Sequence, residues 1–172
     1  DWTPFFHTWE LKGAYPKIFD KPDVGEQAKK LYDEAQEMLK WIIDNNLLEA
    51  RAVIGFFPAN VVDDDSIEVY KDDNRDEVIA KLHNLRQQGE KAKDNPNYSF
   101  SDFIAPKESG VKDYVGAFAV TAGFNSDKLE KKFDEQNDDY GKIMVQALAD
   151  RCAEAFAERM HERVRKEFWG YE

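Results

Sequence analysis

RAVIGFFPAN, at residues 51–60, is a short apolar run closed by a proline. A continuous apolar run of this length predicts a strand buried on both faces. An acidic turn at residues 63–66 follows it, and apolar and polar residues then alternate in IEVYK at residues 67–71. This alternation predicts a half-exposed strand that forms a hairpin with the first. A second β-rich run with small residues, YVGAFAVTAG, lies at residues 114–123.

Helical periodicity surrounds these runs. Apolar residues recur at helical spacing in residues 25–44, 75–88, 126–133 and 139 to about 168. Asn45 and Asn46 are suited to end the first helix, because asparagine tolerates the left-handed conformation. Ser126 or Asn125 is expected to cap the third helix with its side chain. The pair Asp138-Asp139 is expected to start the last.

The remaining segments lack a clear period. Residues 1–23 hold aromatic residues interrupted by prolines and glycine, and we expect a packed strap that contains one short strand. Residues 89–98 are charged and are expected to form a loop. Three or four strands and four helices follow one another without regular alternation and without a repeat. This order predicts a single α+β domain with a mostly antiparallel sheet and no internal boundary.

Composition restricts the function. The 172 residues carry a net charge of −11, and the basic cluster between Arg159 and Lys166 is interleaved with acids. A phosphate backbone would be repelled by such a surface, so nucleic acid is excluded as a partner. A single cysteine, Cys152, fits the cytoplasm, and neither a membrane span nor a signal peptide is found. The start at Asp1 without methionine suggests a piece of a longer protein.

Common catalytic motifs are missing. The sequence has no phosphate-binding glycine loop, its three histidines are scattered, and its adjacent carboxylates are as frequent as an acidic composition makes them. We therefore expect neither a metal site nor catalytic residues. The residues by themselves indicate only a soluble α+β domain with an aromatic strap.

Six blocks in a fixed order resemble a known family. They are DWTPFFHTWELKGAYP at residues 1–16, RAVIGFFPAN at 51–60, LRQQ at 85–88, DFIAP at 102–106, DYVGAFAVTAG at 113–123 and the long block DDYGKIMVQALADRCAEAFAERMHERVRKEFWGY at 138–171. In this spacing they resemble the activation domain of cobalamin-dependent methionine synthase, which binds S-adenosylmethionine (AdoMet). The resemblance covers nearly the whole chain, residues 1–172.

The resemblance implies a fold and a function. The family has a C-shaped α+β domain in which helices flank a central twisted, mostly antiparallel sheet. Its parent enzyme is a methyltransferase that passes methyl from methyltetrahydrofolate through cobalamin to homocysteine. The activation domain presents AdoMet for reductive methylation of inactive cob(II)alamin, which a separate module holds. A flavodoxin-like protein or a diflavin reductase supplies the electron, and the domain alone is not catalytic.

The resemblance also implies site residues. Asp1 matches an aspartate that binds the amino group of AdoMet, and Glu154 matches a ligand-facing glutamate. The alternative for Asp1, which the intact motif behind it disfavours, is a frayed terminus. The alternative for Glu154 is a surface carboxylate that pairs with Arg151 or with the neighbours of Glu158. Asp150 lies one helical turn before Glu154 and is expected to contact the cobalamin module. The family's RxxxGYP-type motif is absent from these residues, so the alternative is a docking domain that does not bind AdoMet by itself.

Overall fold

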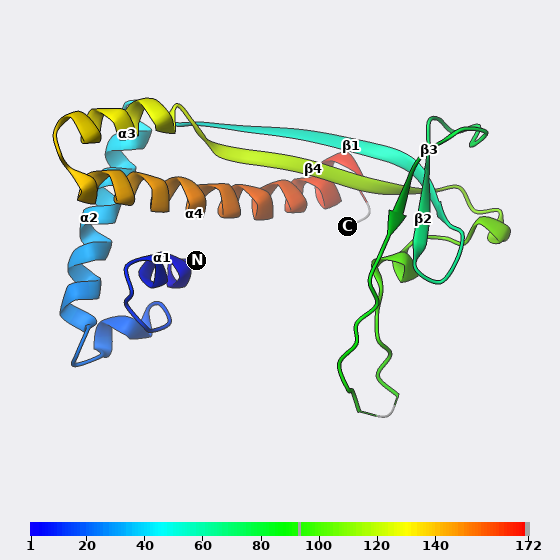
Figure 1. Cartoon of the computed structure of the whole chain (residues 1–172), viewed down its shortest axis with the longest axis horizontal. Coiled ribbons are helices and arrows are strands. Elements are labelled where there is room, and N and C mark those ends of the chain that lie inside the picture. The colour runs from blue at the N-terminus through cyan, green and yellow to red at the C-terminus, as the bar shows by residue number, and fades with distance from the viewer. Residues whose placement is uncertain (93, 171–172) are drawn as a thin grey trace. The chain divides into compact units, whose positions relative to one another are not determined.

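The computed structural model describes residues 1–92 and 94–170, and the chain divides into two compact units. Unit 1 consists of Asp1–Val53 and Ala119–Glu172, and unit 2 of Ile54–Phe118. Two long strands, β1 (Glu49–Val61) and β4 (Asp113–Phe124), contribute residues to both units (Figure 1). This division was not expected from the sequence.

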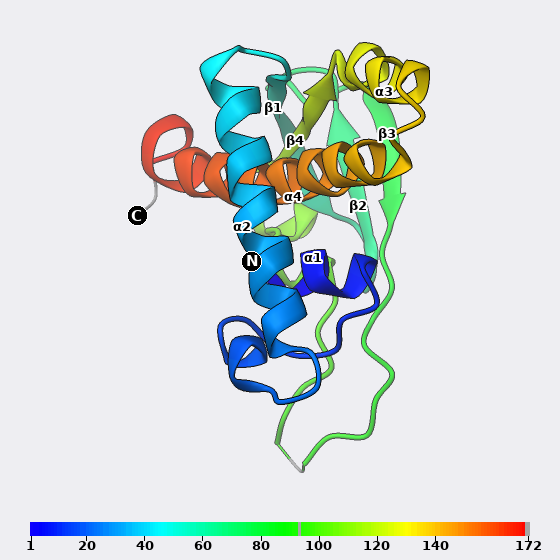
Figure 2. The ribbon, with the colours of Figure 1, turned by 90° about the vertical axis from the view of Figure 1, so that its left-hand side faces the viewer.

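Unit 1 is mainly helical. It contains α1 (Thr3–Thr8), α2 (Gly25–Asp44), α3 (Ser126–Glu135) and α4 (Asp139–Arg163). The long helices α2 and α4 are in contact and cross steeply in both views (Figures 1 and 2). Their facing apolar residues form the core together with two phenylalanines of α1, because each helix buries one apolar stripe. This core contains Phe5, Phe6, Leu11, Ile18, Ala28, Leu31, Ala35, Ile42, Leu129, Met144, Val145, Ala147 and Leu148.

The four strands form one sheet in the order β3-β2-β1-β4. β2 (Ser66–Tyr70) pairs antiparallel with β1, with Ala59 opposite Val69. β3 (Val78–His83) pairs antiparallel with the other edge of β2, with Ile67 opposite Leu82. The predicted α+β class, the hairpin and the antiparallel pairing are therefore confirmed.

Residues 75–88 were predicted to be helical, and this prediction is wrong. Residues 78–83 form β3 instead, and all six of their side chains are exposed. Val78, Ile79, Leu82 and Leu85 occupy helical spacing, but all four side chains are exposed. Backbone pairing with β2 determines the structure here. The exposed β-branched pair Val78-Ile79 also favours a strand.

Burial was also mispredicted in the hairpin. β1 was expected to be buried, but only Ala59 and Asn60 are buried along it. β2 was expected to be half exposed, yet four of its five residues are buried, and Ile67 and Val69 belong to a small core cluster with Ala59 and Val115. The apolar run at residues 51–60 therefore does form a strand, but most of that strand is exposed.

The opening segment has no strand, contrary to expectation. It folds as α1 followed by a 3-10 helix at Lys17–Asp20. Pro4 lies in the first turn of α1, where its missing N–H costs nothing, so the proline favours this helix. The expectation of a packed aromatic strap is confirmed, since the rings of Trp2, Phe5 and Phe19 pack at the edge of neighbouring rings.

The remaining helix predictions are mostly confirmed. α2 ends at Asp44, and Asn46 takes a positive φ of 50° as expected. The side chain of Asp138 caps α4 by accepting a 2.8 Å hydrogen bond from the Gly141 N–H. α3 lacks the expected side-chain cap, because Asn125 is left-handed with φ 72°. α4 ends at Arg163 and continues as a π-helix at Val164–Phe168.

The loop at residues 89–98 is confirmed for the residues that the structure describes, which exclude Lys93. Among the described helices, none combines the length and apolarity that a membrane crossing requires.

Candidate ligand-binding site

Asp1 lies immediately before α1 and is tied to it. One carboxylate oxygen, Oδ1, accepts a 2.9 Å hydrogen bond from the Thr3 N–H. The Thr3 hydroxyl accepts in turn from the Tyr15 N–H at 3.1 Å. Behind these residues, Phe5 and Phe6 are fully buried, which fixes α1 in the core of unit 1. The exposed carboxylate of Asp1 therefore has a defined direction, and Oδ2 is available for a ligand.

Asp150 and Glu154 lie one turn apart on the solvent-facing side of α4. Asp150 is 71% exposed and accepts a 2.6 Å hydrogen bond from the guanidinium of Arg151. The side chain of Glu154 is exposed and makes no hydrogen bond or ion pair with any residue that the structure describes. The alternative in which Glu154 pairs with Arg151 is thus not what the structure shows.

The structure brings α1, which follows Asp1 in the chain, into contact with α4, which carries Asp150 and Glu154. α1 packs against α4 within unit 1 (Figure 1). Phe5 and Phe6 share their core cluster with Met144, Val145 and Leu148 of α4. No hydrogen bond or ion pair joins Asp1 to Asp150 or Glu154 in the described part of the chain. The three carboxylates are exposed, and Asp150 is paired with Arg151, whereas Asp1 and Glu154 make no ion pair with any residue that the structure describes.

The described residues support neither a nucleophilic cysteine nor a metal site. Cys152 is half-buried, and burial raises the pKa of its thiol, which keeps it protonated and unreactive. Within residues 1–92 and 94–170, no group of three or more His, Cys, Asp or Glu side chains could hold a metal ion. The chemistry that Asp1 and Glu154 can supply is electrostatic binding of a cation.

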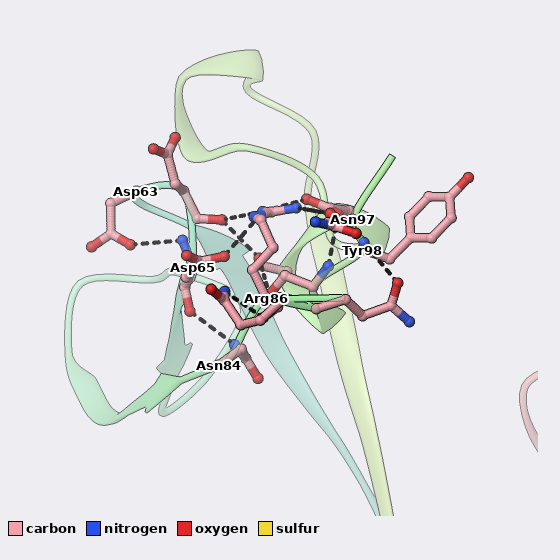
Figure 3. A network of polar contacts seen from close by, with 12 residues as sticks. Asp63, Asp65, Asn84, Arg86, Asn97 and Tyr98 are labelled. Carbon is pink, nitrogen blue, oxygen red and sulfur yellow. Dashed lines mark hydrogen bonds and ion pairs between the residues drawn. The ribbon is translucent and has the colours of Figure 1, made fainter. Parts of the chain in front are cut away.

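Sequence reasoning gave no role to Arg86, which is the centre of a polar network in unit 2 (Figure 3). Its guanidinium donates to both carboxylate oxygens of Asp102, at 2.7 and 2.8 Å. It also donates to the carbonyls of Asp64 and Asn97, and it forms a 3.0 Å ion pair with Asp65. Arg86 and Asp102 lie in the LRQQ and DFIAP blocks of the sequence, which was the one available signal.

This network shifts two pKa values. The hydrogen bonds from Arg86 and from the Ser99 N–H lower the pKa of Asp102 to about 2. Asp102 in turn raises the pKa of Arg86 above its ordinary value. Since the four hydrogen bonds from the two Nη atoms of Arg86 end on protein acceptors, we assign the network to tying Arg86 to Asp64, Asn97 and Asp102.

A hollow in unit 1 was also missed. It measures about 330 Å³ and is lined by Trp9, Leu11, Gln27, Lys30, Leu31, Glu34 and Tyr140. No signal in the sequence indicated it, because its residues come from three separate segments.

Comparison with known proteins gives the fold and site a context. The profile of a protein family described as "Vitamin B12 dependent methionine synthase, activation domain" matches residues 1–172. A solved structure, the crystal structure of the MetH reactivation domain bound to AdoHcy, is 54% identical with a TM-score of 0.88. The match covers 99% of this chain and 52% of that chain, so the present chain spans about half the length of its relative. The chain belongs to the family of activation domains of vitamin B12-dependent methionine synthase.

Proposed function

We propose that this chain forms part of a module that binds AdoMet and presents its methyl group to cobalamin. The observation that carries the proposal is the structural match at 54% identity to a reactivation domain bound to AdoHcy. AdoHcy is what remains of AdoMet once its methyl group has left. A domain that holds AdoHcy has the right shape to hold AdoMet as well.

The carboxylates of unit 1 fit this ligand. AdoMet carries a positive sulfonium and a positive amino group, and carboxylates are the natural partners of both. We assign Asp1 to the amino group, because its Oδ1 is fixed by the Thr3 N–H while Oδ2 remains accessible. We assign Glu154 to the ligand as well, because its exposed carboxylate has no protein partner among the described residues.

The reaction needs no acid or base from this chain. Methyl transfer from a sulfonium is a direct displacement, in which the S–CH₃ bond breaks as the bond to the acceptor forms. Cobalamin, bound in its own module, supplies the accepting metal. The contribution of this chain is to hold the sulfonium at the correct distance and direction, and such positioning lowers the barrier entropically.

Partners follow from the same proposal. The cobalamin module must dock against the face that presents AdoMet, and Asp150, which is largely exposed on α4, is assigned to that contact. A flavodoxin-like protein or a diflavin reductase supplies the electron. We place the whole assembly in the cytoplasm, where a lone unpaired cysteine is stable.

The test is isothermal titration of AdoMet into residues 1–172 and into a chain extended past Glu172 to the length of the relative. The extended chain is expected to bind, and residues 1–172 to bind more weakly. Replacement Asp1→Asn in the extended chain is expected to weaken binding. If neither chain binds, AdoMet binding is wrong and a docking domain becomes the better description.

A further inference from the structure

The hollow in unit 1 is distinct from the proposed AdoMet residues. It is lined by residues of α2, of the first turn of α4 and of the segment that follows α1. None of Asp1, Asp150 and Glu154 lines it. Its volume of about 330 Å³ is at the lower end of small-molecule sites, which suits a ligand with one or two fused rings.

Two aromatic rings and two leucines form its apolar surface. The rings of Trp9 and Tyr140 lie 4.8 Å apart between centroids and are tilted by 52°. Leu11 and Leu31 are 5% and 6% exposed and belong to the core of unit 1, so the floor is rigid. A flat ring placed in the hollow would contact aromatic faces and a fixed apolar floor.

Three polar side chains of α2 border the same hollow. Gln27, Lys30 and Glu34 are spaced by three and four residues, which places them on one face of the helix. The Glu34 carboxylate accepts a hydrogen bond from the Tyr140 hydroxyl through Oε2. That bond gives the carboxylate a fixed orientation.

Lys30 is only loosely engaged. Its Nζ lies 3.8 Å from Oε1 of Glu34, and its side chain is 78% exposed. An exposed pair at this distance contributes little to stability, so the ammonium can turn to an anionic ligand at small cost. The hollow thus offers a movable cation and an oriented anion at one border.

We propose that this hollow is a binding site for a small planar heteroaromatic carboxylate that carries an N–H donor. The ring lies against Trp9 and Tyr140, the carboxylate pairs with Lys30, and the N–H donates to Glu34. Without the charge of Lys30 the ligand's carboxylate loses its partner, and without the charge of Glu34 the ligand's N–H loses its acceptor. The site does not depend on the proposed AdoMet function.

The probe is indole-3-acetate, which has a bicyclic ring, a carboxylate and a ring N–H. Binding to residues 1–172 is measured by saturation-transfer NMR and by isothermal titration. Replacement Lys30→Glu is expected to weaken binding about tenfold, which corresponds to the loss of one charge-assisted contact. Indole, which lacks the carboxylate, should bind the wild type and Lys30→Glu equally.

Lys132→Glu is the matched control. Lys132 is also a lysine of unit 1 that lies beside an aromatic ring, with its Nζ 5.1 Å from the centroid of Trp41, and it borders a different hollow. It makes the same change of net charge and should leave binding unchanged. Circular dichroism checks that both variants fold.

Three outcomes would overturn the inference. They are the absence of saturation transfer from indole-3-acetate, an equal loss of affinity in Lys30→Glu and Lys132→Glu, and displacement of the probe by AdoMet. The last would show that the hollow belongs to the AdoMet site, while the first two would leave the AdoMet proposal untouched.

Discussion

The guanidinium of Arg86 holds both carboxylate oxygens of Asp102, with Nη1–Oδ2 at 2.7 Å and Nη2–Oδ1 at 2.8 Å. This two-pronged geometry is the strongest form of an ion pair between side chains. The two lie sixteen positions apart in the sequence, so the pair closes the long loop between β3 and the 3-10 helix at Phe100–Phe103. The Ser99 N–H donates to the same carboxylate at 2.8 Å.

The first prediction concerns pH. Asp102 has its pKa lowered to about 2 by Arg86 and Ser99, whereas an unfolded aspartate titrates near 4. A carboxyl group with a lowered folded pKa stabilises the fold above its unfolded pKa, and this stabilisation is lost as pH falls through the folded pKa. Asp102→Asn is therefore expected to be less stable than the wild type at pH 7 and at pH 5. The difference should shrink between about pH 4 and pH 2.

Urea unfolding of both proteins at several pH values measures this difference. Asp76→Asn is the matched control, since Asp76 is an exposed carboxylate of unit 2 that makes no hydrogen bond or ion pair with the described residues. Its stability difference from the wild type should be small. A difference for Asp102→Asn that stays constant from pH 7 to pH 2 would mean that the ion pair is not what stabilises the loop.

The second prediction concerns Asn60, which is 3% exposed at the end of β1. Its amide donates to the carbonyls of Ala105 and Val111, both at 2.9 Å, and its oxygen accepts from Arg75 at 2.6 Å. Asn60→Ala leaves these partners unsatisfied, and the free energy of unfolding is expected to fall by about 1–3 kcal/mol. Chemical denaturation measures the change.

Asn45→Ala is the control for Asn60. Asn45 donates to the Trp41 carbonyl at the exposed end of α2, where water can replace the bond. Its replacement should cost less than about 1 kcal/mol, because the freed carbonyl remains solvated. Equal losses in both variants would show that the Asn60 network is not specially stabilising.

The third prediction concerns the start of α4. The Asp138 carboxylate accepts from the Gly141 N–H at 2.8 Å and so satisfies one of the unpaired donors of the first turn. Asp138→Ala is expected to lower the free energy of unfolding by about 1 kcal/mol. Asp138→Asn retains an accepting oxygen and should be nearly neutral. A thermal melt separates the two, and an equally destabilised asparagine variant would point to charge in place of capping.

Much of the helical part of this fold is visible in the sequence. α2 could be predicted because its apolar residues keep one period over many turns, and α4 because those of its first turns do so, with Asn46 and Asp138 as end signals. β3 could not be predicted, because its short run fits helix and strand equally and pairing with β2 decides between them. Burial of β1 and β2 depends on neighbours that no local pattern specifies.

The candidate site shows the same limit. Asp1, Asp150 and Glu154 were found through the resemblance of their motifs, since an exposed carboxylate has no distinctive local pattern in an acidic chain. The Arg86–Asp102 pair and the hollow beside Trp9 were found only in three dimensions. Both bring together residues from distant segments, and long-range pairing of this kind leaves no period in the sequence.

The fourth prediction separates a ligand-facing role of Glu154 from a surface role. If Glu154 contacts AdoMet, then Glu154→Gln in the chain extended past Glu172 removes one charge-assisted contact and weakens AdoMet binding by about tenfold or more. Glu158→Gln is the matched control, because Glu158 is exposed one turn further along α4. Titration calorimetry of the two variants gives the comparison. Unfolding stability should not change in either, since neither carboxylate has a partner among the described residues. An affinity that is unchanged in Glu154→Gln, or reduced equally in both variants, would place Glu154 outside the binding site and leave Asp1 as the remaining candidate.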